Sequence, residues 1–271
     1  MYIKDNFLLT NKTAEKLYFD YAKNAKICDY HCHLSEYQIL ENKQFNDIFE
    51  IWLAGDHYKW RLMRNFGVDE EYITGSASNK EKFITYCTVL GTAFGNPLYH
   101  WSQVELKEYF GCQLEINAQN AEAIWNECNA YIAKNEVTPK SLIESSNVSH
   151  VFTTNEVFDD LTVFDKIASK DYKFKVIPAF RADKIMNIEA PRYLEFLGML
   201  EKVTHKISSI DDLEKALEAR LEEFLRVGAR ASDIAVEYVC DVPTREEANE
   251  VLVSDISGNK PSVKEIDTFK G

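Results

Sequence analysis

Residues 26–34 read KICDYHCHL, and the rest of the chain is best interpreted outward from this stretch. Residues 26–30 predict a β-strand, and His31 and His33 follow at its end. Side chains two positions apart on an extended strand point to the same side. Two imidazoles on one side can bind one divalent metal, and Zn²⁺ is the metal we expect. A pair of structural histidines is the alternative. Two histidines alone do not complete a catalytic zinc site, which usually has three protein ligands.

Further β-prone segments lie at 150–153, at 175–180 and within 229–239, so we expect about four strands. Strands that alternate with helices are typical of βα units around a parallel sheet. We therefore expect a single domain over 1–271, with the block at about 46–147 as a helical insertion after the first strand. Helices are expected at 57–66, 80–90, 96–110, 121–133, from 138 onward, 158–169, 191–203, 210–227 and 244–253.

Local signals support several of these helix starts. Asn96-Pro97 and Thr138-Pro139 each place a cap residue before a proline suited to the first helical turn. Ser262 and Glu265 form a capping box, which predicts a last helix near the end of the chain. Because so few residues follow this start, we expect a chain that is interrupted there.

Composition limits the function classes. The 271 residues are 45% hydrophobic and carry a formal net charge of −13, which argues against nucleic acid as a partner. No stretch approaches the roughly 20 apolar residues of a membrane span, and no signal peptide is recognisable. Six cysteines without a CxxC pair favour reduced thiols and a cytoplasmic protein. The composition does not exclude an anionic small molecule as the substrate, provided that a local cationic pocket opposes the negative charge of the whole chain.

Several longer segments resemble the uronate (glucuronate) isomerase family of the amidohydrolase superfamily. The resemblance implies reversible aldose–ketose isomerisation of D-glucuronate to D-fructuronate and of D-galacturonate to D-tagaturonate. It also implies a (β/α) barrel of the metal-dependent hydrolase type. Since about four strands cannot close an eight-stranded barrel, we expect an incomplete one. The segments are CDYHCHL (28–34), IWLAGDHYKWRLMRNFGV (51–68), NPLYHWSQVELKEYFG (96–111), IWNECNA (124–130), VIPAFRADK (176–184) and GARASD (228–233).

The resemblance also implies roles for individual residues. His31 and His33 would be metal ligands. Tyr58 would contact substrate oxygens and assist proton movement, and the neighbouring His57 would line the substrate site. Without the resemblance, both are more simply explained as structural residues on a helix.

Two further residues complete the expected site. Arg181 would pair with the substrate carboxylate or hydroxyls, because a guanidinium suits a carboxylate better than an ammonium does. A salt bridge to Asp183 is its alternative. Asp233 would be an active-site carboxylate at a strand end.

The chain departs from the family in two respects. Family members usually carry a histidine directly after the ASD segment, where this chain has Ile234. A late aspartate that would be a metal ligand has no counterpart, so the expected metal site is incomplete. The alternatives are therefore a non-catalytic half-barrel that acts as a scaffold or sugar binder, or a metal-dependent hydrolase. A homo-oligomer is also left open.

Overall fold

The computed structural model describes residues 3–271, and these residues form two compact units. The helical unit comprises the residues up to Lys26 together with Asn42–Asn147. The strand unit comprises Ile27–Glu41 and Val148–Gly271. Each unit has a core of its own.

In the described part of the helical unit, all regular elements are helices. They are α1 (Lys12–Leu17), the π-helical η1 (Tyr18–Ala22), α3 (Ile48–Trp52), α4 (His57–Asn65), the 3₁₀ turn η2 (Glu70–Tyr72), α5 (Asn79–Leu90), α6 (Pro97–Phe110), α7 (Ala121–Asn135) and α8 (Pro139–Ser145).

The strand unit combines a small sheet with helices. Its elements are β1 (Ile27–Cys32), α2 (Glu36–Glu41), β2 (Val148–Glu156), α9 (Thr162–Ala168), β3 (Lys175–Arg181), α10 (Asp183–Met186), α11 (Tyr193–Val203), α12 (Ile210–Arg226), α13 (Arg245–Ile256) and α14 (Val263–Lys270).

The sheet has three parallel strands in the order β1-β2-β3. The three expected strands at 26–30, 150–153 and 175–180 are therefore present, and each is longer than its sequence signal. The expected fourth strand within 229–239 is wrong as a strand, because it is reduced to a single parallel bridge between Phe180 and Ser232. Beyond that bridge the backbone leaves the sheet, since the amide of Ala235 donates to the side chain of Asp183 at 2.9 Å.

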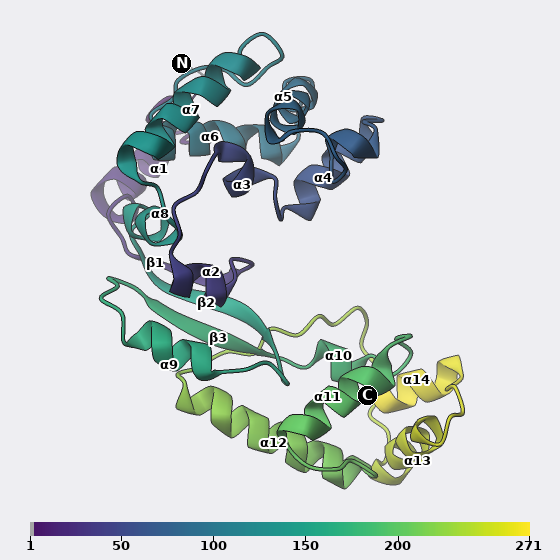
Figure 1. Cartoon of the computed structure of the whole chain (residues 1–271). Helices are drawn as coiled ribbons and strands as arrows, with labels where there is room; N and C mark the ends of the chain where they lie inside the picture. The colour runs from purple at the N-terminus through teal and green to yellow at the C-terminus, as the bar shows by residue number, and fades with distance from the viewer. Residues whose placement is uncertain (1–2) are drawn as a thin grey trace. The chain divides into compact units, whose positions relative to one another are not determined.

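Helices cover one face of the sheet in the strand unit. Figure 1 shows α9 and α12 running along the strands on the side of β3. Phe180 of β3 packs edge-on against Phe224 of α12, with ring centroids 5.2 Å apart. Phe224 of α12 belongs to this core, whereas Leu213 and Ala216 of the same helix belong to a second core of the strand unit. The core between these elements contains Leu161, Val163, Phe164, Ile167, Phe224 and Ala229.

The helical unit is held by a larger apolar core. Trp52 of α3 stacks on Phe83 of α5 at 5.9 Å, and Tyr86 donates or accepts a hydrogen bond with Ser102 of α6 inside this core. The fully buried members include Ile48, Phe83, Tyr86, Cys87, Leu90, Leu106, Ile116 and Ile124. This packing explains why a block without strands is ordered.

The start signals are confirmed. Asn96 caps α6 with Pro97 in the first turn, and Thr138 forms a capping box at α8. Ser262 and Glu265 form the expected capping box, and α14 continues from it to Lys270. Among the described residues, no helix is both long and apolar enough to cross a membrane.

Candidate functional site

Polar side chains gather where the strands of the sheet end. In the register of the parallel pair, Glu156 at the end of β2 lies directly beside Arg181 at the end of β3. The amide of Asp233 donates to the carbonyl of Phe180 at 3.0 Å, which brings Asp233 to the same edge. The carboxyl ends of parallel strands are where α/β proteins place their active sites.

The two histidines of the opening segment face each other. His31 belongs to β1, and His33 follows the end of that strand. Their Nε2 atoms are 3.1 Å apart, and their rings meet nearly at right angles. Two nitrogen ligands of one tetrahedral Zn²⁺, each at about 2.0–2.1 Å, would lie about 3.3 Å apart. The pair therefore fits two positions of one metal site.

The two imidazoles do not by themselves form a complete metal site. Within residues 3–271, no group of three His, Cys, Asp or Glu side chains is arranged to hold a metal ion.

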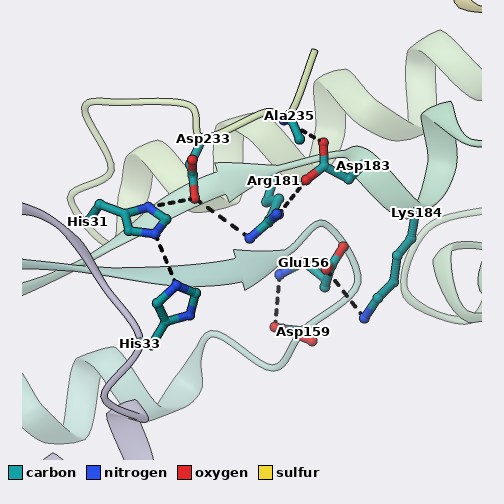
Figure 2. Close-up of polar contacts among 9 residues, drawn as sticks. All are labelled: His31, His33, Glu156, Asp159, Arg181, Asp183, Lys184, Asp233 and Ala235. Carbon is teal, nitrogen blue, oxygen red and sulfur yellow. Dashed lines mark hydrogen bonds and ion pairs between the residues drawn. The ribbon is translucent and has the colours of Figure 1, made fainter. Parts of the chain in front are cut away.

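Asp233 lies between a histidine and an arginine, as Figure 2 shows. Its Oδ2 atom is 3.2 Å from Nδ1 of His31 and 3.8 Å from Nη1 of Arg181. The same oxygen is buried and has no partner in hydrogen-bond geometry, so the close contact with His31 is not an aligned hydrogen bond. Asp233 thus places a carboxylate between the imidazole of His31 and the guanidinium of Arg181.

Arg181 is held on one edge of its guanidinium. Its Nε donates to Oδ2 of Asp183, and the other oxygen of Asp183 accepts the amide of Ala235. This hydrogen bond is the main reason that the pKa of Arg181 is raised, so the guanidinium stays charged. The salt bridge to Asp183 and a role in anion binding are therefore compatible, because the salt bridge uses Nε of Arg181 and orients the two Nη atoms.

Glu156 was not expected from the sequence. Its Oε1 atom is 3.3 Å from Nζ of Lys184, whereas its Oε2 atom is buried without a hydrogen-bond partner. Desolvation is the main cause that raises the pKa of Glu156, against the opposing charges of Lys184 and Arg181. The signal that could have found it is positional: it is the last residue of a strand whose neighbour ends at Arg181.

His57 and Tyr58 lie in the helical unit, on α4. Asp56 caps this helix by accepting the amides of Tyr58 and Lys59. The rings of His57 and Tyr58 lie 4.3 Å apart, and Tyr58 is 55% exposed. Tyr58 also lines a cavity of about 540 Å³.

Two of the recognised segments meet at that cavity. Its lining comes from the segment at 51–68 and from the segment that opens α6, and includes Tyr58, Arg61, Asn96, Pro97 and Trp101. The fold thus brings together residues that are far apart in the sequence, and gives Tyr58 an amphipathic, partly aromatic surrounding.

A larger cavity lies toward the other ends of the strands. It has a volume of about 700 Å³, and its lining includes Phe152 and Ile177 together with His150 and Lys175 at the starts of β2 and β3. None of the expected site residues lines it. The end of α9, with Ile167 and Ala168, and Val227 after α12 also line this cavity.

The fold and the strand-end cluster define an α/β protein with a site of enzymatic character at the carboxyl edge of a parallel sheet. Comparison with known proteins identifies the family to which the chain belongs. The family model described as glucuronate isomerase matches residues 1–271, and the chain belongs to that family.

Relatives and solved structures agree with this assignment. The uronate isomerases of Caldanaerobacter subterraneus subsp. tengcongensis and Clostridium acetobutylicum are 44% and 43% identical over 99% of this chain. A uronate isomerase structure from Thermotoga maritima matches the whole chain with a TM-score of 0.93 at 33% identity, over 60% of its own length. The glucuronate isomerase structure from Caulobacter crescentus, at 20% identity and a TM-score of 0.89 over 59% of its length, shows the same fold. The chain spans about 58% of the length of the curated relatives that it matches.

Proposed function

We propose that this chain supplies the metal-binding and carboxylate-binding part of a uronate isomerase. The reaction would interconvert D-glucuronate with D-fructuronate and D-galacturonate with D-tagaturonate. The observation that carries the proposal is the convergence of His31, His33, Arg181 and Asp233 at the carboxyl edge of one parallel sheet.

We further propose that the strand unit is an incomplete (β/α) barrel. Three parallel strands and one bridge support this, because they form an open sheet with an unpaired edge. The cavity beside Phe152 and Ile177 supports it too, since the inner face of a closed barrel is filled by side chains. That all residues form one domain with a helical insertion stays a prediction.

His31 and His33 would hold a divalent metal ion, for which we expect Zn²⁺. Their facing Nε2 atoms at 3.1 Å support this assignment. Such an ion supplies Lewis-acid polarisation of a carbonyl or hydroxyl oxygen when it is bound. A catalytic zinc site usually has a third protein ligand, and none is grouped with this pair within residues 3–271.

The remaining groups of the chain would bind the sugar acid and move its proton. Arg181, oriented by Asp183, would pair with the substrate carboxylate through the part of its fork that Asp183 does not use. Isomerisation moves a proton between C2 and C1 through an enediol, so a base must lie within hydrogen-bond reach. We assign this role to Asp233, whose carboxylate lies at the strand ends beside His31 and Arg181.

His57 and Tyr58 are proposed as further substrate contacts on the basis of the family resemblance alone. The phenol of Tyr58 would return a proton to the substrate or stabilise a developing oxyanion. A cytoplasmic location and a homo-oligomer also stay predictions.

Proton exchange at C2 of D-glucuronate in D₂O tests the proposal more directly than turnover does. The chain would be assayed by NMR with Zn²⁺, alone and mixed with the part of the Caldanaerobacter relative that the match does not cover. We expect exchange and fructuronate formation in the mixture, and loss of both when His31 and His33 are replaced by asparagine. A mixture that binds Zn²⁺ through this pair and shows no exchange would contradict the proposed reaction.

A further inference from the structure

We propose that Glu156 is a substrate-recognition residue, which accepts a hydrogen bond from a hydroxyl on one of the two carbons next to the uronate carboxylate. The inference rests on the proposed function, because it takes Arg181 as the anchor of that carboxylate. It adds a residue that recognises sugar hydroxyls next to the carboxylate bound by Arg181.

The position of Glu156 supports this role. In the parallel register it lies beside Arg181, and neighbouring strands are about 4.8 Å apart. Side chains at paired positions of adjacent strands share one face of the sheet. A carboxylate bound at Arg181 therefore places the C5 and C4 hydroxyls of a uronate within reach of Glu156.

The hydrogen bonds of Glu156 support it as well. Oε1 is occupied by Lys184, whose ammonium lies over the stacked rings of Phe158 and Phe196 at 5.5 and 5.3 Å. These contacts hold the carboxylate in place, as Figure 2 shows for Glu156 and Lys184. Oε2 is buried and has no hydrogen-bond partner. An ionised carboxylate accepts hydrogen bonds only, and a sugar hydroxyl is a donor that can satisfy this oxygen.

The contact with Lys184 accounts for one oxygen of Glu156, and the position beside Arg181 offers a role for the other. The ion pair with Lys184 uses only one of the two oxygens, and buried acceptors in folded proteins are normally satisfied. Asp255 in α13 offers a matched comparison, because it also has a buried oxygen without a partner and a raised pKa. It lies within a helix, however, and not at a strand end beside Arg181.

The test measures ligand affinity of the 271-residue chain by NMR titration. Wild type, Glu156→Gln and the control Asp255→Asn would each be titrated with D-glucuronate, with its C4 epimer D-galacturonate, and with hexanoate. Hexanoate has the carboxylate and a six-carbon chain but no hydroxyl. Glutamine keeps the shape of glutamate and removes its charge, and thermal melts followed by circular dichroism check that each variant is folded.

We expect Glu156→Gln to weaken uronate binding roughly 10- to 100-fold, the range for a hydrogen bond to a charged acceptor. The same variant should bind hexanoate as well as wild type or better, because a negative charge beside Arg181 is removed. Asp255→Asn should leave all three affinities unchanged. A loss for one epimer only assigns the C4 hydroxyl, and an equal loss for both assigns the C5 hydroxyl.

Two results would overturn the inference while the proposed function stands. One is that the wild-type chain binds uronates and the Glu156→Gln variant binds them with the same affinity. The other is an equal loss for uronates and hexanoate, which indicates structural damage. Absence of uronate binding by the wild-type chain, in contrast, would contradict the carboxylate site of the proposed function and the inference with it.

Discussion

Replacement of Arg220 by methionine should destabilise the strand unit, because this buried cation ties α12 to the loop after β2. The side chain of Arg220 is 5% exposed. Its Nε donates to the carbonyl of Val157 at 2.6 Å, and its Nη2 donates to the carbonyl of Asp159 at 2.7 Å. Methionine keeps most of the apolar stem but leaves both carbonyls without a donor.

The magnitude follows from these two contacts. A hydrogen bond from a charged donor contributes about 1.5–3 kcal/mol, so two of them contribute about 3–6 kcal/mol. Part of this is offset, because the variant no longer has to desolvate a guanidinium. We therefore expect a net decrease of about 2–4 kcal/mol in the free energy of unfolding.

Urea unfolding followed by far-ultraviolet circular dichroism measures this change. Arg226→Met is the matched control, since it lies in the same helix and its ion pair with Asp165 has both side chains 57% exposed. Such a surface pair contributes less than about 1 kcal/mol. If Arg220→Met shifted the unfolding midpoint no more than Arg226→Met does, the two carbonyl contacts would not hold the loop as argued.

Three further predictions concern metal affinity, uronate affinity and the stability of the fold at low pH. His31→Asn should weaken Zn²⁺ binding about 100-fold or more in calorimetry, whereas His205→Asn, whose ring contacts the backbone of Asp212, should not change it. Arg181→Lys should weaken uronate binding about tenfold with Zn²⁺ affinity unchanged, because an ammonium lacks the planar fork; equal affinity would argue against a bidentate contact. Hydrogen bonds from Ser208 are the main cause that lowers the pKa of Asp212 to about 2, so its carboxylate stabilises the fold above its unfolded pKa. The stability difference between wild type and Asp212→Asn should therefore be full at pH 7 and disappear as the pH falls from 4 to 2.

Local patterns predicted the elements well where a local cause determines them. The cap at Asn96, the cap at Thr138 and the capping box at Ser262 are interactions within a few residues, so their sequence signals are sufficient. The strand after Ala229 failed because a strand needs a partner on at least one side over several residues. There the backbone forms one bridge with β3, and the amide of Ala235 then donates a hydrogen bond to Asp183.

The candidate site divides in the same way. His31 and His33 were found because their spacing on one strand is itself the signal. Glu156 and Arg220 were not, because their importance depends on which strand end or loop lies beside them in space. Arg220 is buried between Ala216 and Phe224 of the same helix, and its contacts with two backbone carbonyls and with Glu223 explain why a cation is buried there.

The charge pattern of the strand-end cluster explains how an acidic chain can bind an acidic ligand. With a net charge of −13, a freely moving cation would be neutralised by the nearest carboxylate. Arg181 is instead fixed through Nε by Asp183, which is itself held by the amide of Ala235. Its Nη1 lies 3.8 Å from Asp233, beyond hydrogen-bond distance, so this side of the guanidinium is oriented but not satisfied. A ligand carboxylate that binds there gains hydrogen bonds that no group in the cluster makes, and this gain can oppose the long-range repulsion. If the charge alone mattered, Asp183→Asn would strengthen anion binding; if orientation dominates, as we infer, that substitution should weaken it.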